Sequence, residues 1–237
     1  MAYIEDWYWE DFEEVESTND VAKSFAEGFN EKFVITAKKQ LNGRGRRGRG
    51  WISINGNLFA SFGIKLEARY VGVLSFIVSL SVLDAVKSFN NEIDVKLKWP
   101  NDVLVNGRKV SGILIERAGE YFVVGAGVNI VDYPENVDLL YEAISLKSVN
   151  IQTDSIGMLK LIVNRIDYYL AQWKLYGFEE IKNKWLKYAK NLGQKIIIRF
   201  EDGEKEGIFA GVDDNGYLLL NVEGSQEKVY AGDVFYI

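Results

Sequence analysis

Residues 98–116 read KWPNDVLVNGRKVSGILIE and contain the clearest local signal in the chain. Within them, the apolar runs Val103–Val105 and Lys109–Glu116 flank the pair Asn106-Gly107. Asn and Gly tolerate positive φ angles at both central positions of a type I′ turn, so this pair predicts a two-residue β-hairpin. Strands joined in this way are antiparallel neighbours in a sheet.

The segments on either side of the hairpin predict a larger α+β unit. Apolar residues at helical spacing predict helices over residues 17–28, 70–89, 156–170 and 178–189. Apolar runs rich in β-branched residues predict strands over 33–37, 58–66, 95–99 and 121–130. This mixture is typical of an α+β fold with a mixed or antiparallel sheet flanked by helices. Serines and Asp84 interrupt the helix over 70–89, which lacks the roughly 20 clean apolar residues of a membrane span, so we expect a buried helix.

The texture of the sequence changes after about residue 191. Short apolar runs at 196–200, 207–212, 217–222 and 229–230 alternate with Gly, Asp and Asn turns. This pattern predicts a small β-barrel of residues 191–237 that follows a main domain of residues 1–190. A chain of 237 residues is long enough for these two units.

Composition excludes several kinds of site. The chain has no cysteine and no histidine, which excludes disulfides, thiolate and imidazole catalysis, and His-based zinc sites. Its 28 Lys and Arg residues against 34 Asp and Glu residues give a net charge of −6, which is unfavourable for wrapping nucleic acid. Acidic residues stand in the N-terminal segment where a signal peptide would carry positive charge, so we expect a cytoplasmic protein that does not bind membranes.

One loop departs from this acidic background. Residues 43–50 read GRGRRGRG, with Arg44, Arg46, Arg47 and Arg49 and no acid among them. Glycines allow close backbone approach, and guanidinium groups donate in pairs to phosphate or carboxylate, which together indicate an anion-binding loop. A dinucleotide-binding turn would start a helix here and a Walker A loop would continue with Lys-Ser/Thr, and neither follows. A solvated basic loop and an RGG-like nucleic-acid segment remain as alternatives.

A second polar cluster stands at residues 98–102, Lys-Trp-Pro-Asn-Asp, directly before the hairpin. Asn101 and Asp102 follow a proline at a strand end, where side chains often cap the chain or bind ligands. Lys109 follows the turn, and Gly112 leaves room for the close approach of a ligand. An ordinary hairpin with polar ends is the alternative interpretation.

Taken together, the two clusters resemble the biotin protein ligase family. The motifs that carry the resemblance are Ser17-Thr-Asn19, Gln40-x-x-Gly-Arg-Gly-Arg-Arg-Gly-Arg-x-Trp51, Lys98-Trp-Pro-Asn-Asp102, Arg108-Lys-x-x-Gly-Ile-Leu-x-Glu116, Gly125-Ala-Gly-x-Asn129 and Gly211-Val-Asp-Asp-Asn-Gly-Tyr-Leu-Leu-Leu220. The resemblance implies a class II synthetase-like biotinyl/lipoyl transferase domain followed by a small SH3-like β-barrel. Because about sixteen residues precede Ser17, we expect a monofunctional form without an N-terminal DNA-binding domain, and therefore no DNA partner.

The resemblance also implies a reaction with two steps. Biotin and MgATP would give biotinyl-5′-AMP and pyrophosphate, and a lysine of a biotin carboxyl carrier protein would then attack the mixed anhydride. The implied partners are thus biotin, ATP with Mg²⁺, and the carrier protein, and a homodimer is the expected assembly. A lipoate–protein ligase of the same fold, and a nucleic-acid-binding protein that uses the glycine-arginine loop, are the alternatives.

Site residues follow from the resemblance, position by position. It implies catalytic roles for Arg46, Lys109 and Asp102, the last as a base for the acceptor lysine or as a Mg²⁺ ligand. The residues implied for biotin are Ser17, Thr18, Asn19, Gln40, Gly43, Arg44, Gly45, Arg46, Lys109 and Gly112. Those implied for the adenylate are Arg46, Arg49, Trp51, Asn101, Lys109 and Asn129, with Trp51 as a stacking surface for adenine.

Each of these roles has a structural alternative. Ser17 and Thr18 could simply cap a helix, Trp51 could be a core residue, and Arg46 and Lys109 could be exposed charges. The loop over 43–50 is expected to become ordered over the adenylate and to shield it from water.

Overall fold

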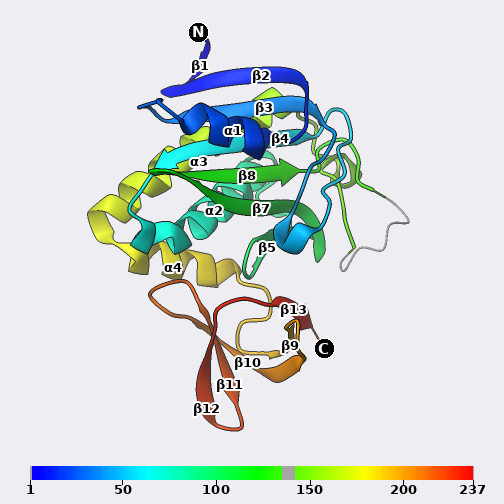
Figure 1. Cartoon of the computed structure of the whole chain (residues 1–237). Helices are drawn as coiled ribbons and strands as arrows, with labels where there is room; N and C mark the ends of the chain where they lie inside the picture. Colours follow the sequence, from blue (N-terminus) through cyan, green and yellow to red (C-terminus); the bar gives the residue numbers. More distant parts are fainter. Residues whose placement is uncertain (1, 135–141, 237) are drawn as a thin grey trace.

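The larger of two β-sheets forms the centre of the molecule (Figure 1). The structure is a computed structural model that describes residues 2–134 and 142–236. The strands of this sheet are β1 (Ala2–Ile4), β2 (Trp7–Val15), β3 (Phe33–Gln40), β4 (Leu58–Lys65), β5 (Val95–Lys98), β6 (Asp102–Val105), β7 (Arg108–Ala118) and β8 (Tyr121–Val128). In the described residues their order is β1-β2-β3-β4-β8-β7-β6-β5. Strands β2 and β3 pair in parallel and the other neighbours are antiparallel, which confirms the predicted mixed sheet.

Helices cover both faces of this sheet (Figure 1). Helix α1 (Thr18–Ala26) packs on one face, against β3, β4, β7 and β8. Helices α2 (Val71–Phe89), α3 (Ser155–Tyr176) and α4 (Phe178–Tyr188) lie on the other face. The four helices predicted from apolar spacing are confirmed, and α3 extends six residues beyond the predicted end at 170.

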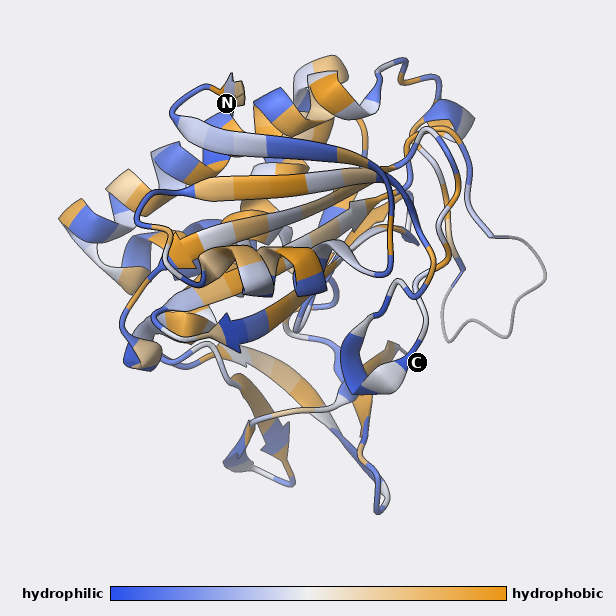
Figure 2. Cartoon of the chain, turned by 45° about the horizontal axis from the view of Figure 1, so that its top comes forward, coloured by the Kyte–Doolittle hydropathy of each residue, from blue (hydrophilic) through white to orange (hydrophobic). Residues whose placement is uncertain are grey.

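The central strands are apolar on both sides because both faces of the sheet are covered. In β3, Phe33 and Ile35 point to the cluster under α1, whereas Val34 points to the main core under α2 and α3. Side chains alternate between faces along a strand, so a strand buried on both faces needs a continuous apolar run. Figure 2 shows mostly hydrophobic residues in the central strands and hydrophilic stretches at some strand ends, and β3 itself ends in Lys38, Lys39 and Gln40.

Helix α2 is long and apolar enough to cross a membrane by composition alone, and it is largely buried inside this fold. It packs between the strands β5 to β8 and helix α3. The hydroxyl groups of Ser79 and Ser81 donate to the carbonyls of Phe76 and Ile77, which satisfies them away from water. The expected buried helix is therefore confirmed.

The hairpin predicted at Asn106-Gly107 joins β6 and β7. Both turn residues have positive φ angles, 49° and 78°, as a type I′ turn requires. Val105 pairs with Arg108 across the turn, and a bulge between Val103 and Leu104 follows. Asp102 pairs with Gly112 and Lys109 with Leu104, so Asp102 and Lys109 lie on neighbouring strands, where their side chains form an ion pair.

The smaller sheet contains the C-terminal residues. Its strands are β9 (Lys195–Arg199), β10 (Glu204–Val212), β11 (Leu218–Val222), β12 (Ser225–Val229) and β13 (Asp233–Tyr236), and in the described residues their order is β12-β11-β10-β9-β13. All its pairings are antiparallel, in agreement with the predicted C-terminal β-domain. The indole of Trp99 donates to the Gly216 carbonyl at 3.0 Å, and one continuous core joins both sheets. The boundary at residue 190 stays a prediction.

The sequence patterns missed four strands: β1, β2, β12 for most of its length, and β13. Strand β2 has acidic residues at several positions and pairs with β3 in parallel, a long-range contact. Strand β13 pairs with β9 and brings the end of the described chain to the main domain. Both strands matter for the site.

Candidate functional site

A cavity of about 350 Å³ opens beside the carboxyl-terminal end of β5 and the start of α1. Its walls come from the glycine-arginine loop, the β6–β7 hairpin, β8 and the C-terminal strand β13. Every residue implied for the site by the sequence lines this cavity except Gly43. Gly43 lies next to the cavity and forms a backbone hydrogen bond with Trp51, at 2.8 Å. The fold thus brings together at one cavity the widely separated motifs that carry the resemblance.

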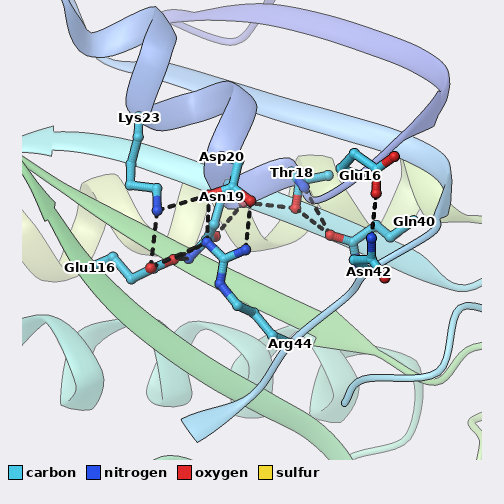
Figure 3. A network of polar contacts seen from close by, with 10 residues as sticks. Glu16, Thr18, Asn19, Asp20, Lys23, Gln40, Asn42, Arg44 and Glu116 are labelled. Atoms are coloured by element: carbon cyan, nitrogen blue, oxygen red, sulfur yellow. Dashed lines mark hydrogen bonds and ion pairs between the residues drawn. The ribbon is translucent and has the colours of Figure 1, made fainter. Parts of the chain in front are cut away.

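One end of the cavity is polar and carries no net charge. The backbone N–H and the hydroxyl of Thr18 both donate to Oε1 of Gln40, at 2.9 and 3.0 Å (Figure 3). The Ser61 hydroxyl lies 2.8 Å from Oγ1 of Thr18 and 2.6 Å from Oδ1 of Asn19. Ser17, Thr18 and Asn19 are all buried. Thr18, Asn19 and Gln40 line the cavity and Ser61 lies behind them, and we call these four side chains the neutral end.

The helix-cap interpretation of Ser17 is confirmed for its position but not for its side chain. Ser17 occupies the N-cap position of α1, yet its side chain makes no capping hydrogen bond. Its carbonyl accepts from the N–H groups of Asp20 and Val21, as the first turn of a helix requires. The hydroxyl of Ser17 is therefore not used to start the helix, and it lines the cavity.

A second part of the cavity wall carries cations. Nζ of Lys109 lies 2.7 Å from Oδ1 of Asp102, across the hairpin. Arg46 approaches Asn101, with Nη1 and Oδ1 3.4 Å apart, and burial lowers the pKa of its guanidinium. Arg49 also lines this end. We call Arg46, Arg49 and Lys109 the cationic end.

The glycine-arginine loop is folded back on itself. Gly45 donates to the carbonyl of Arg49 at 2.6 Å, and residues Arg46–Gly48 form a 3-10 turn in which Arg47 has a φ of 55°. The four arginines of the loop point in three directions. Arg44 binds acids on α1 and β7, Arg47 and Arg49 bind Asp233 on β13, and Arg46 faces the cavity.

The ring of Trp51 packs against two glycines of the sheet, Gly112 and Gly127. A Cβ atom on Gly127 would come within 2.4 Å of the Trp51 ring, and one on Gly112 within 3.0 Å. Gly127 is therefore required for the ring to lie on β8, and at Gly112 a side chain would make a tight contact with the ring. Among the described residues, Nε1 of Trp51 is buried with no hydrogen-bond partner. The tryptophan is a wall of the cavity, so the core alternative does not describe it.

Glycine also makes room for Lys109. A Cβ atom on Gly112 would meet Cε and Nζ of Lys109 at 3.0 and 3.1 Å. The ammonium lies 5.6 Å from the centre of the Trp51 ring. Gly112 thus leaves room for the Lys109 side chain and the Trp51 ring, and the approach of a ligand at this position stays a prediction.

Asn101 and Asn129 are held by the backbone. Nδ2 of Asn101 donates to the Ile113 carbonyl at 2.6 Å, which fixes the amide beside Arg46. Asn129 is buried and its backbone pairs with Val110 at 2.8 Å. Both residues lie at the cationic end, where the sequence implied a nucleotide.

The sequence alone did not identify the site position of Asp233 or a role for Lys98. Asp233 binds Nη1 of Arg47 at 3.1 Å and Nη2 of Arg49 at 2.7 Å, although it lies more than 180 residues away in the chain. Lys98 was visible in its motif without an assigned role. It is buried in the cavity wall, and burial lowers the pKa of its ammonium to about 7, against the opposing effect of Asp102.

The distribution of charge argues against the nucleic-acid alternative. Three of the four loop arginines are paired with carboxylates in the described structure, and the fourth faces a cavity. A surface that binds nucleic acid presents a row of unpaired positive charges to solvent. A concave site with a neutral end and a cationic end instead suits a small ligand that has an anionic group.

The fold and this cavity define a class of protein, the ligases that activate a small carboxylic acid. The model of the Biotin/lipoate A/B protein ligase family matches residues 12–129, and the model of the Biotin protein ligase C terminal domain matches residues 192–236. The second match includes the β-domain and therefore favours biotin over lipoate.

Individual relatives agree. A biotin–[acetyl-CoA-carboxylase] ligase of Paracoccus denitrificans is 35% identical over 93% of this chain and 97% of its own length. The biotin protein ligase of Aquifex aeolicus, solved in complex with biotin and ATP, superposes with a TM-score of 0.84 at 28% identity, covering 96% of this chain and 97% of the other. The enzyme of Leishmania major with biotinyl-5-AMP gives a TM-score of 0.72 at 26% identity, covering 94% and 99%. The chain belongs to the biotin protein ligase family.

Proposed function

We propose that the protein activates biotin with ATP to form biotinyl-5′-AMP and transfers the biotinyl group to a lysine of a biotin carboxyl carrier protein. The observation that carries this proposal is the cavity with a neutral end and a cationic end. Biotin has an uncharged ureido ring that needs both donors and acceptors, and the side chains of Thr18, Asn19 and Gln40 supply them. Its carboxylate would lie toward Lys109 and Arg46.

The first step brings two anions together. The biotin carboxylate attacks the α-phosphate of ATP, and negative charge increases on the phosphoryl oxygens. Positive groups fixed before the reaction stabilise that charge without reorganisation. Lys109 is held beside Asp102 and Arg46 beside Asn101, so both are preorganised.

We propose that Mg²⁺ enters as part of the MgATP substrate. The carboxylates that line the described part of the cavity are Asp102 and Asp233, and the described residues contain no group of three or more acidic side chains placed to hold a metal ion. One or two carboxylates together with phosphate oxygens suit Mg²⁺, whereas a site made of protein alone needs more ligands. Asp102 would hold the ion, which neutralises phosphate charge when it is bound.

The second step needs a neutral amine on the carrier lysine. With no histidine in the chain, Asp102 is the carboxylate placed at the cationic end beside Lys109, and we propose that it accepts or orients the amine proton. Its two proposed roles belong to different steps: Asp102 would hold Mg²⁺ in the first, which releases pyrophosphate, and would act on the lysine amine in the second, which forms the amide and releases AMP.

The proposal also includes a cytoplasmic location, where ATP is available, and a homodimer. Strand β1 lies at the edge of the larger sheet, and an edge strand can pair with a second chain. Sedimentation equilibrium at several concentrations tests the dimer separately from the activity.

Biotin-dependent ATP–pyrophosphate exchange tests the proposed function. We expect exchange with biotin and transfer of biotin to a purified carrier domain. Exchange with lipoate and not with biotin would establish the lipoate–protein ligase instead. Salt-sensitive binding of single-stranded DNA, with no exchange for either acid, would replace both with a nucleic-acid-binding function.

A further inference from the structure

Four charged side chains form a closed ring beside the neutral end of the cavity (Figure 3). Asp20 and Lys23 lie on α1, Arg44 on the loop, and Glu116 on β7. Arg44 donates to both oxygens of Asp20 at 2.6 Å and to Glu116 at 3.1 Å. Lys23 lies 2.8 Å from Asp20 and 3.1 Å from Glu116. We call these residues the charged ring; its formal charge sums to zero.

The charged ring acts on the cavity through two residues. Arg44 and Asn19 line the cavity, whereas Asp20, Lys23 and Glu116 lie behind them and are not part of its wall. Glu116 is the last residue of the motif that begins at Arg108. The proposed reaction at the cationic end does not use it. Its contacts therefore call for a separate explanation.

Glu116 fixes the orientation of the Asn19 amide. Nδ2 of Asn19 donates to Oε2 of Glu116 at 2.7 Å, and its Oδ1 lies 2.6 Å from the Ser61 hydroxyl. A Cβ atom on Gly125 would lie 2.4 Å from this Oδ1, so the amide is also confined by β8. With one partner at each end and a strand beneath it, the amide keeps one orientation toward the cavity.

The same acids neutralise Arg44. Its hydrogen bonds hold the pKa of Asp20 well below its usual range, so that carboxylate stays ionised at neutral pH. Burial raises the pKa of Glu116. Hydrogen bonds from Asn19 and Lys23 and the charge of Arg44 lower this pKa by more, so the net shift is downward. Arg44 therefore faces two carboxylates, whereas Arg46 in the same loop has an amide as its near partner.

We propose that Glu116 and Asp20 are positioning residues that determine the specificity of the cavity for an uncharged ring system. They hold Asn19 in its orientation and bind the Arg44 guanidinium, so the neutral end stays neutral while the cationic end of the same loop stays cationic. This inference rests on the proposed function, in which the ureido ring of biotin occupies the neutral end.

A double-mutant cycle tests the charged ring. We would measure KM for biotin, KM for ATP and kcat in the exchange reaction for Glu116→Gln, Asp20→Asn, Arg44→Gln and the double variant Asp20→Asn/Arg44→Gln. Glu13→Gln is the matched control, because it breaks an exposed ion pair with Lys38 on the neighbouring strands. Melting temperature is recorded for each variant.

Glu116→Gln and Asp20→Asn are expected to raise KM for biotin about tenfold and to leave KM for ATP within about twofold. Glu116→Gln weakens the contact that orients Asn19, and Asp20→Asn leaves the charge of Arg44 without its main partner. Both effects are confined to the neutral end. The double variant is expected to raise KM by less than the product of the two single effects, since it removes the charge that Asp20 neutralises.

Two results would overturn the inference: equal changes in KM for biotin and ATP, or independent effects of Asp20→Asn and Arg44→Gln. A fall in melting temperature that parallels the rise in KM for biotin across the variants would also overturn it, because it would indicate a structural role only. Failure of the proposed function is a different result, because it is seen as absence of biotin-dependent exchange in the unmodified protein.

Discussion

Arg44 and Arg46 stand two residues apart in one loop, and the structure gives them opposite environments. Arg44 forms ion pairs with Asp20 and Glu116, whereas Arg46 faces the cavity beside an amide. The two ends of the cavity differ in the same way. A repeated residue type therefore has no fixed role in this loop, because acids on distant elements decide which arginine remains available.

Arg46→Ala breaks the cationic end and has the largest expected effect. Removal of one preorganised donor to a developing oxyanion lowers kcat by about 10²–10³-fold. Pyrophosphate exchange with saturating biotin and ATP measures this, and Lys109→Ala is expected to behave alike. Lys38→Ala serves as the control, since Lys38 is exposed and pairs with Glu13. Unchanged exchange in both variants would remove these residues from the mechanism.

Lys98→Met tests the environment beside the cationic end, because Lys98 is expected to make the free energy of unfolding depend on pH. The folded-state pKa of Lys98 is about 7, below the ordinary 10.5, so the unfolded chain binds more protons between these values. Stability from this residue therefore increases with pH above about 7, by at most about 1.4 kcal/mol per pH unit. Urea unfolding at pH 7, 8 and 9 should show this rise in the unmodified protein and a flatter profile in the variant.

Lys96→Met provides the comparison for that measurement, because Lys96 lies on the same strand and is partly exposed. Parallel pH profiles for Lys98→Met and the unmodified protein would contradict the expected contribution of Lys98.

Gly125→Ala disturbs the neutral end without changing any charge. The added Cβ would lie 2.4 Å from Oδ1 of Asn19, so the amide must move. Overpacking of this kind costs about 1–3 kcal/mol, and we expect KM for biotin to rise about tenfold. KM for ATP, measured in the same reactions, should change little. An equal rise in both would mean that the two ends of the cavity are not independent.

Asp233→Asn has the smallest expected effect and concerns the other half of the loop. It weakens two partly exposed ion pairs, with Arg47 and Arg49, that together are worth about 1 kcal/mol. We expect trypsin to cleave within residues 43–50 about fivefold faster, because local opening becomes easier. Asp214→Asn, at an exposed acid of the same domain, is the control. Cleavage at the original rate would show that β13 does not hold the loop.

The parts of this protein that were predictable are those set by short stretches of sequence. The Asn106-Gly107 turn depends on two residues, and the buried helices and strands depend on local periodicity, so both follow from the sequence. The glycine-arginine loop and the residues around Lys98 and Asp102 were visible because unusual residues stand close together in the chain. The family resemblance then brought these separate motifs into one site.

What was missed depends on contacts between distant residues. Asp233 reaches the loop only because β13 pairs with β9, and Glu116 meets Asn19 only because α1 lies over β7. Asp233 does not differ from an ordinary surface acid when the sequence is read locally, and Glu116 was visible in its motif but without a role. Strand β2 was missed for the same reason, since its parallel partner lies beyond a complete helix.

The core that runs without interruption from the larger sheet into the C-terminal sheet couples the two units thermodynamically. Trp99 reinforces this continuity through its hydrogen bond to Gly216. A ligand held at one end of a cooperative unit lowers the frequency of opening throughout that unit. Amide hydrogen exchange in β10 and β11, far from the cavity wall, should therefore slow when biotin and ATP are bound, and calorimetry should record one transition for the whole chain.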